Sequence, residues 1–133
     1  MVGSRSDAST TRDIAHMIEA DARPHVIDVA GETTIETLAG VLGLATACVA
    51  NDSGAMHMAA AVGTPLVALF GPTREHETAP LTRAGGRAEV LAHQVWCRPC
   101  MLRECPIDHR CMKGIAPDRV FAALTPYMDR HTL

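Results

Sequence analysis

The chain has 133 residues, 47% of them hydrophobic and 20% charged, and its formal net charge is −3. This length predicts a single domain over residues 1–133 with a core of its own. Neither the charge nor the 3% aromatic content favours nucleic acid as a partner. No apolar run reaches the roughly 18 residues of a membrane span, and the polar N-terminus is unlike a signal peptide. We therefore expect a cytoplasmic location, either free or peripheral at the inner membrane.

Apolar runs and periodic stretches alternate along the chain. In order, we expect a helix over 10–22, a strand over 26–29, a helix over 34–42, a strand over 45–50, a helix over 53–62 closed by Gly63, a strand over 66–70, a loop over 72–87, a strand over 89–92 and a helix from Pro117. Pro126 should end or kink the last helix. Strands and helices that alternate with short links predict an α/β fold with a parallel sheet.

The most informative stretch is the one where the strand over 45–50 runs into Asp52-Ser53-Gly54 and a helix that carries His57. The first N–H groups of a helix lack partners, and the helix dipole places partial positive charge there, so this junction suits a diphosphate. Gly54 would let a ligand approach the backbone closely. The alternative is a plain helix cap, because Asp and Ser are both good capping residues.

These residues also carry a resemblance. The chain is similar to the C-terminal half of glycosyltransferase family 9, the ADP-heptose:lipopolysaccharide heptosyltransferases, and most of all to the heptosyltransferase II type. The matching segments are Asn51–Gly54 with His57, Gly63–Pro65, Ala68–Thr73, Cys97–Met112 and Ile115–Val120. The resemblance implies a Rossmann-like parallel sheet, the C-terminal half of a GT-B glycosyltransferase that moves heptose from ADP-heptose to the lipopolysaccharide inner core.

Several roles follow from the resemblance. Ser53, Gly54 and His57 would hold the diphosphate, and Asp52 would accept hydrogen bonds from sugar hydroxyls. Thr73 could reach a phosphate or the ribose. In the turn 31–34, Thr33 could lie near the base and ribose, although an ordinary capped turn explains that segment equally well.

The resemblance also implies what this chain lacks. The family's general base and its acceptor site belong to the N-terminal half, so no catalytic residue is expected here. The chain would then be a fragment that is inactive alone. The transfer requires no cofactor. The alternative is a non-enzymatic nucleotide- or metal-binding module on the same fold.

The second strong local feature is a cysteine-rich loop at about 95–113. Cys97, Cys100, Cys105 and Cys111 fall within fifteen residues, and such clustering in a reducing compartment suggests a metal or redox role. Structural zinc held by these thiolates fits the ligand count, an iron–sulfur site also needs four thiolates, and His109 could replace one ligand. Reduced thiols or reversible disulfides are the alternatives. Trp96 is expected to anchor the loop.

Overall fold

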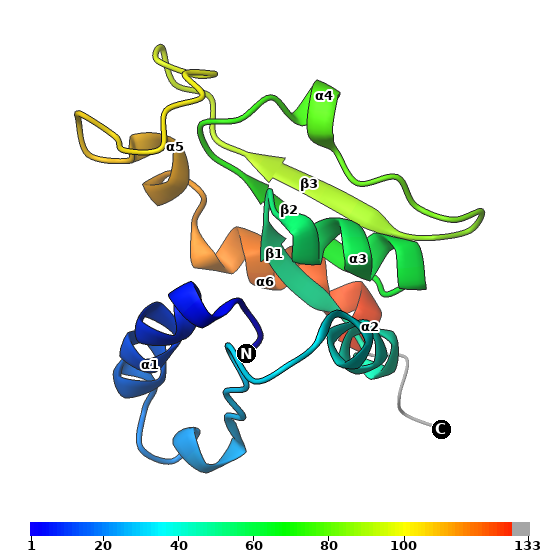
Figure 1. The fold of residues 1–133 in the computed structure, drawn as a ribbon. Helices are drawn as coiled ribbons and strands as arrows, with labels where there is room; N and C mark the ends of the chain where they lie inside the picture. The colour runs from blue at the N-terminus through cyan, green and yellow to red at the C-terminus, as the bar shows by residue number, and fades with distance from the viewer. Residues whose placement is uncertain (129–133) are drawn as a thin grey trace. The chain divides into compact units, whose positions relative to one another are not determined.

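The computed structural model describes residues 1–128, and the chain divides into two compact units (Figure 1). The N-terminal unit comprises Met1–Val41, and the sheet unit begins at Leu42. That residues 1–133 form a single domain stays a prediction.

The N-terminal unit consists of short helices and extended segments. Its helical elements are η1 (Arg5–Asp7), α1 (Ala8–Met17), η2 (Arg23–His25) and the first turns of α2 (Ile35–Leu44). The helix expected over 10–22 ends early, at Met17, because Ile18 adopts extended backbone. The guanidinium of Arg23 then donates to the carbonyl of Ile18 at 2.9 Å, which satisfies an acceptor at the end of the helix. Thr34 caps α2, since its Oγ1 accepts the N–H of Thr37 at 3.2 Å.

The prediction of a strand over 26–29 is wrong, but that segment does pair with the start of the chain. The N–H of Val29 donates to the carbonyl of Met1 and the N–H of Gly31 to that of Gly3, both at 3.0 Å. Two bonds spaced two residues apart on both segments match the pattern of a parallel pair. The contact is too short to form a ladder.

The described part of the sheet unit, up to Met128, contains three parallel strands. They are β1 (Cys48–Asn51), β2 (Leu66–Phe70) and β3 (Ala88–Ala92), in the spatial order β1-β2-β3. Ala50 pairs with Ala68, and Ala68 pairs in turn with Val90. The predicted α/β fold with a parallel sheet is confirmed.

Helices cover both faces of this sheet. The helix α3 (Gly54–Val62) contacts β1 and β2, whereas α5 (Arg110–Lys113) and α6 (Pro117–Met128) contact β2 (Figure 1). Val67 and Leu91 of the strands form a core with Ile115 and Ala123. Because side chains alternate along a strand, the buried Phe70 and its neighbours two residues apart face the other side. Burial on both faces explains why β2 is a continuous apolar run.

Some expectations for this unit are wrong. The loop expected over 72–87 contains a short helix, α4 (Glu75–Thr78). The last helix continues past Pro126 and is described as far as Met128, so Pro126 does not end it, and a kink there stays a prediction. Trp96 is 79% exposed and therefore does not anchor the cysteine loop. Over residues 1–128, no helix combines the length and apolar character needed to cross a membrane.

The C-terminal end of α3 provides a test of the fold. Gly63 has φ of +90°, and its N–H donates to the carbonyls of Ala59 and Ala60. Left-handed backbone is strained for any residue with a Cβ. Gly63→Ala should therefore lower the free energy of unfolding by roughly 1 kcal/mol, measured by urea denaturation.

Gly40→Ala is the matched control. Gly40 lies inside α2, and an added Cβ would meet nothing within 4 Å. Alanine there should raise stability by about 0.5–1 kcal/mol. A shift of the same sign in both variants would contradict the assigned backbone conformation.

Candidate functional site

The candidate site lies where β1 ends and α3 begins. Ser53 is the N-cap residue of α3, in extended backbone with φ of −157° and ψ of 167°, and its hydroxyl makes no capping bond. The first N–H groups of α3 therefore face outward without intrahelical partners, at the carboxyl edge of a parallel sheet. This is the edge at which open α/β sheets bind ligands.

Gly54 has no evident structural reason to be glycine. Its φ lies outside the left-handed region, and a Cβ added there would meet no atom within 4 Å. Alanine would also be the better residue in the first turn of a helix. Gly40 and Gly43 in α2 have the same open surroundings, so open space alone does not indicate a ligand. Gly54 differs from them because it opens α3 at the carboxyl edge of the sheet, where a missing Cβ leaves room for an anion at the helix N-terminus.

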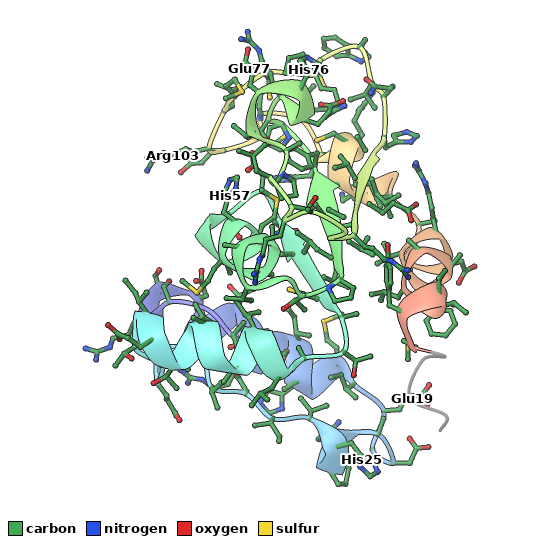
Figure 2. The ribbon with its side chains drawn as sticks, turned by 90° about the vertical axis from the view of Figure 1, so that its right-hand side faces the viewer. Glu19, His25, His57, His76, Glu77 and Arg103 are labelled. Carbon is green, nitrogen blue, oxygen red and sulfur yellow. The ribbon has the colours of Figure 1, made fainter. Side chains whose placement is uncertain are left out.

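His57 lies one turn into α3 and is exposed. Figure 2 shows its side chain projecting from the helix. The neighbouring Met56, Ala59 and Ala60 are buried, so the helix packs through those residues and leaves His57 free. The spacing of four residues places His57 on the same helix face as Ser53.

Asp52 is held by a residue that the sequence did not indicate. Its Oδ2 accepts the hydroxyl of Thr78, the last residue of α4, at 2.9 Å. The same hydroxyl lies 3.2 Å from the carbonyl of Arg74. A hydroxyl has one proton, and the shorter contact to a charged acceptor is the stronger. One oxygen of Asp52 is thus engaged within the protein.

The first residues of the segment that follows β2 are fixed by a buried guanidinium. Arg98 donates through Nε to the carbonyl of Gly71 at 2.7 Å and through Nη2 to the carbonyl of Thr73 at 3.2 Å. It also meets the Glu75 carboxylate with both terminal nitrogens, at 2.8 and 3.3 Å. The Arg98 side chain is 3% exposed and that of Glu75 is 25% exposed. The hydrogen bonds from Arg98 lower the pKa of Glu75.

Thr73 has an unusual environment. Its Oγ1 is buried and, among the residues that the structure describes, it has no hydrogen-bond partner. Buried polar atoms are nearly always paired, so an orphan of this kind often marks a place where a water or ligand belongs. Thr73 therefore stays a candidate contact. Thr33 belongs to the N-terminal unit, and its role stays a prediction.

The four clustered cysteines all line one small pocket, of about 60 Å³, together with His109. All are free thiols. Backbone N–H groups of Ile107, His109 and Asp108 lower the pKa of the Cys105 thiol. Even so, within residues 1–128 no group of three or more His, Cys, Asp or Glu side chains is arranged to hold a metal ion. Zinc at Cys97, Cys100, Cys105 and Cys111 stays a prediction.

Sequence comparison relates the chain to one family. A model of glycosyltransferase family 9 (heptosyltransferase) matches residues 1–110. The lipooligosaccharide heptosyltransferase 2 of Campylobacter jejuni is 35% identical over 96 residues, which are 71% of this chain and 30% of that protein. The lipopolysaccharide heptosyltransferase 2 of Escherichia coli K12 is 35% identical over 82 residues, 62% of this chain and 24% of that protein. The chain thus spans less than a third of these relatives.

Solved structures share the fold. The E. coli ADP-heptose lps heptosyltransferase II superposes with a TM-score of 0.82 at 28% identity, covering 99% of this chain and 36% of that one. A glycosyl transferase family 9 structure from Veillonella parvula superposes with a TM-score of 0.75 at 20% identity, over 97% of this chain and 36% of that one. The Rossmann-like α/β sheet expected for a GT-B enzyme is confirmed.

The buried Arg98–Glu75 pair should dominate the stability of the sheet unit's carboxyl edge. Arg98→Met leaves a carboxylate and two carbonyls without their donor, and should cost roughly 2–4 kcal/mol at pH 7. The pKa of Glu75 is lowered in the folded state. The pair therefore stabilises the fold fully at a pH above the pKa of an unfolded glutamate, near 4.3. This stabilisation is lost as the pH falls through the pKa that Glu75 has in the folded protein. The loss of unfolding free energy in the variant should therefore be smaller at a pH below both of these pKa values than at pH 7, as urea denaturation at the two pH values would measure.

Arg74→Met serves as the control for this measurement. Arg74 pairs with Glu77 at 2.9 Å, but their side chains are 46% and 55% exposed. Removing an exposed pair should cost less than about 1 kcal/mol. If Arg98→Met and Arg74→Met lower the free energy of unfolding equally, the Arg98–Glu75 pair does not dominate the stability of this edge.

The zinc prediction has a direct test. If the four cysteines hold zinc, protein purified without chelator should contain about one zinc per chain. The thiols should then become reactive only after the metal is removed. A zinc content near zero together with four freely titrating thiols would reject the prediction.

Proposed function

The chain belongs to glycosyltransferase family 9, and from this membership we propose that its sheet unit binds the ADP-heptose donor of a heptosyl transfer to the lipopolysaccharide inner core. The proposal takes the donor from the E. coli relative, which is an ADP-heptose lps heptosyltransferase. The chain covers 36% of that structure. We therefore assign the acceptor-binding site and the general base to sequence outside this chain.

The junction of β1 and α3 carries the proposal. Gly54 opens α3 at the carboxyl edge of the sheet, and its missing Cβ lets a diphosphate approach the first turn of the helix. The Ser53 hydroxyl, uncommitted to capping, and the exposed His57 flank that turn. Together they supply backbone donors, a hydroxyl and an imidazole to one anion, and this combination exceeds what a plain helix cap requires.

The chemistry that follows is stabilisation of a leaving group. As the bond between the sugar and the diphosphate breaks, negative charge grows on the phosphate oxygens. Donors that are already fixed in place stabilise that charge without reorganising. Asp52 would repel the phosphates, and we assign it instead to the sugar hydroxyls, where a carboxylate is a strong acceptor. Thr73 and Thr33 are the further candidates for contacts with the nucleotide.

Gly54→Ala separates a ligand role from a structural one. Open space around Gly54 and the helix propensity of alanine predict unchanged or slightly higher stability. An added methyl group against the diphosphate should still weaken ADP binding by at least tenfold, measured by calorimetric titration. His57→Ala should likewise weaken ADP binding about tenfold, the value of one charge-assisted hydrogen bond.

The remaining variants define the site further. Ser53→Ala should weaken ADP binding less than His57→Ala does, because the backbone N–H donors remain. Asp52→Asn should leave ADP affinity unchanged. The control is His25→Ala, which removes an exposed histidine of the N-terminal unit (Figure 2) and should bind ADP like the wild type. If Gly54→Ala and His57→Ala also bind ADP like the wild type, the helix-cap alternative is correct.

A further inference from the structure

The helix α4 joins two elements of the carboxyl edge that are distant in sequence. At its first residue, the Glu75 carboxylate binds the Arg98 guanidinium across 23 positions of sequence. At its last residue, the Thr78 hydroxyl binds the Asp52 carboxylate across 26 positions. A four-residue helix has little stability of its own, so these contacts at its ends decide where it sits.

The contact to Asp52 leaves one carboxylate oxygen for another partner. Thr78 donates to Oδ2, and an ionised carboxylate can accept further hydrogen bonds at both oxygens. Asp52 is half-buried, so its side chain has limited freedom once Oδ2 is fixed. An aspartate held in this way presents Oδ1 in one direction, which is what recognition of a particular hydroxyl requires.

Arg98 fixes the other end of the same element. It is 3% exposed, and it binds the carbonyls of Gly71 and Thr73 as well as Glu75. A planar guanidinium with donors in a fixed geometry can satisfy all of these acceptors together, which a lysine ammonium cannot. The start of the segment after β2 and the start of α4 are thereby held as one piece.

We propose that Thr78 is a specificity-determining positioning residue, which orients Asp52 toward the donor sugar, and that Arg98 holds α4 in the position this requires. The inference rests on the proposed binding of ADP-heptose and adds the residues that set sugar recognition. Thr78 acts through Asp52 and is not assigned a contact with the substrate.

The experiment compares ADP with ADP-heptose in calorimetric titrations. Thr78→Val keeps the shape of the side chain and removes its hydroxyl. It should leave ADP affinity within about twofold of wild type and weaken ADP-heptose roughly fivefold to tenfold, the usual range for one hydrogen bond. Thr78→Ser restores a hydroxyl and should recover most of the ADP-heptose affinity. A merely structural role would not produce this separation between the two ligands.

Thr125→Val is the matched control. Thr125 also donates to a carbonyl four residues earlier in its helix, at 3.0 Å from Phe121, just as Thr78 approaches the carbonyl of Arg74. It makes no contact with Asp52. Its ratio of ADP-heptose to ADP affinity should equal that of wild type.

A double-mutant comparison tests the route through Asp52. If Thr78 acts by orienting that carboxylate, Thr78→Val added to Asp52→Asn should cost no further ADP-heptose affinity. Arg98→Lys keeps the positive charge but loses the planar guanidinium. Like Thr78→Val, it should lower the affinity for ADP-heptose relative to the affinity for ADP.

Two results would overturn the inference. In one, Thr78→Val changes ADP and ADP-heptose affinity equally or not at all. In the other, its effect adds fully to that of Asp52→Asn. Failure of the proposed function would look different. In that case His57→Ala and Gly54→Ala would bind ADP and ADP-heptose no more weakly than the wild type does.

Discussion

The parallel pairing of β1, β2 and β3 is the constraint on which the site depends. Parallel strands deliver their carboxyl ends to one edge of the sheet. The chain therefore leaves β1, β2 and β3 on the same side, at Asp52, Gly71 and His93. The spatial order β1-β2-β3 then determines which of these segments meet. Arg98, after β3, reaches the segment after β2, and Thr78, after β2, reaches Asp52, after β1.

The strands and long helices of the sheet unit were predictable because their signals are local. An apolar run such as β2, a capping residue such as Ser53 and a terminal glycine such as Gly63 each act within a few residues. Prediction failed where a contact distant in sequence decides the conformation. The short α4 has a polar sequence typical of a loop, and it lies between contacts to Arg98 and Asp52 that no periodicity reveals.

In the candidate site, too, local sequence signals were predictable and contacts between distant residues were not. Ser53, Gly54 and His57 form a contiguous motif, so their types and spacing were enough to place them together at the start of α3. Arg98 and Thr78 were missed because each lies more than twenty positions from its partner. Nothing in the sequence around Arg98 indicates burial, yet its side chain is 3% exposed. Only the fold supplies the acceptors that make its burial favourable.

Electrostatics links the buried pair to the binding of an anion. The chain carries a net charge of −3, and both Asp52 and Glu75 lie on segments at the carboxyl edge, where a diphosphate is proposed to bind. Unpaired carboxylates at this edge would repel it. The Arg98 guanidinium offsets the charge of Glu75, and the Thr78 hydroxyl engages one oxygen of Asp52. The neutral Thr78 hydroxyl leaves the charge of Asp52 in place, so the diphosphate is best placed on the N-terminal turn of α3 and the carboxylate beside the sugar. The Arg98–Glu75 pair thus removes one of the two negative charges from this edge, and the contact with Thr78 fixes the position of the other.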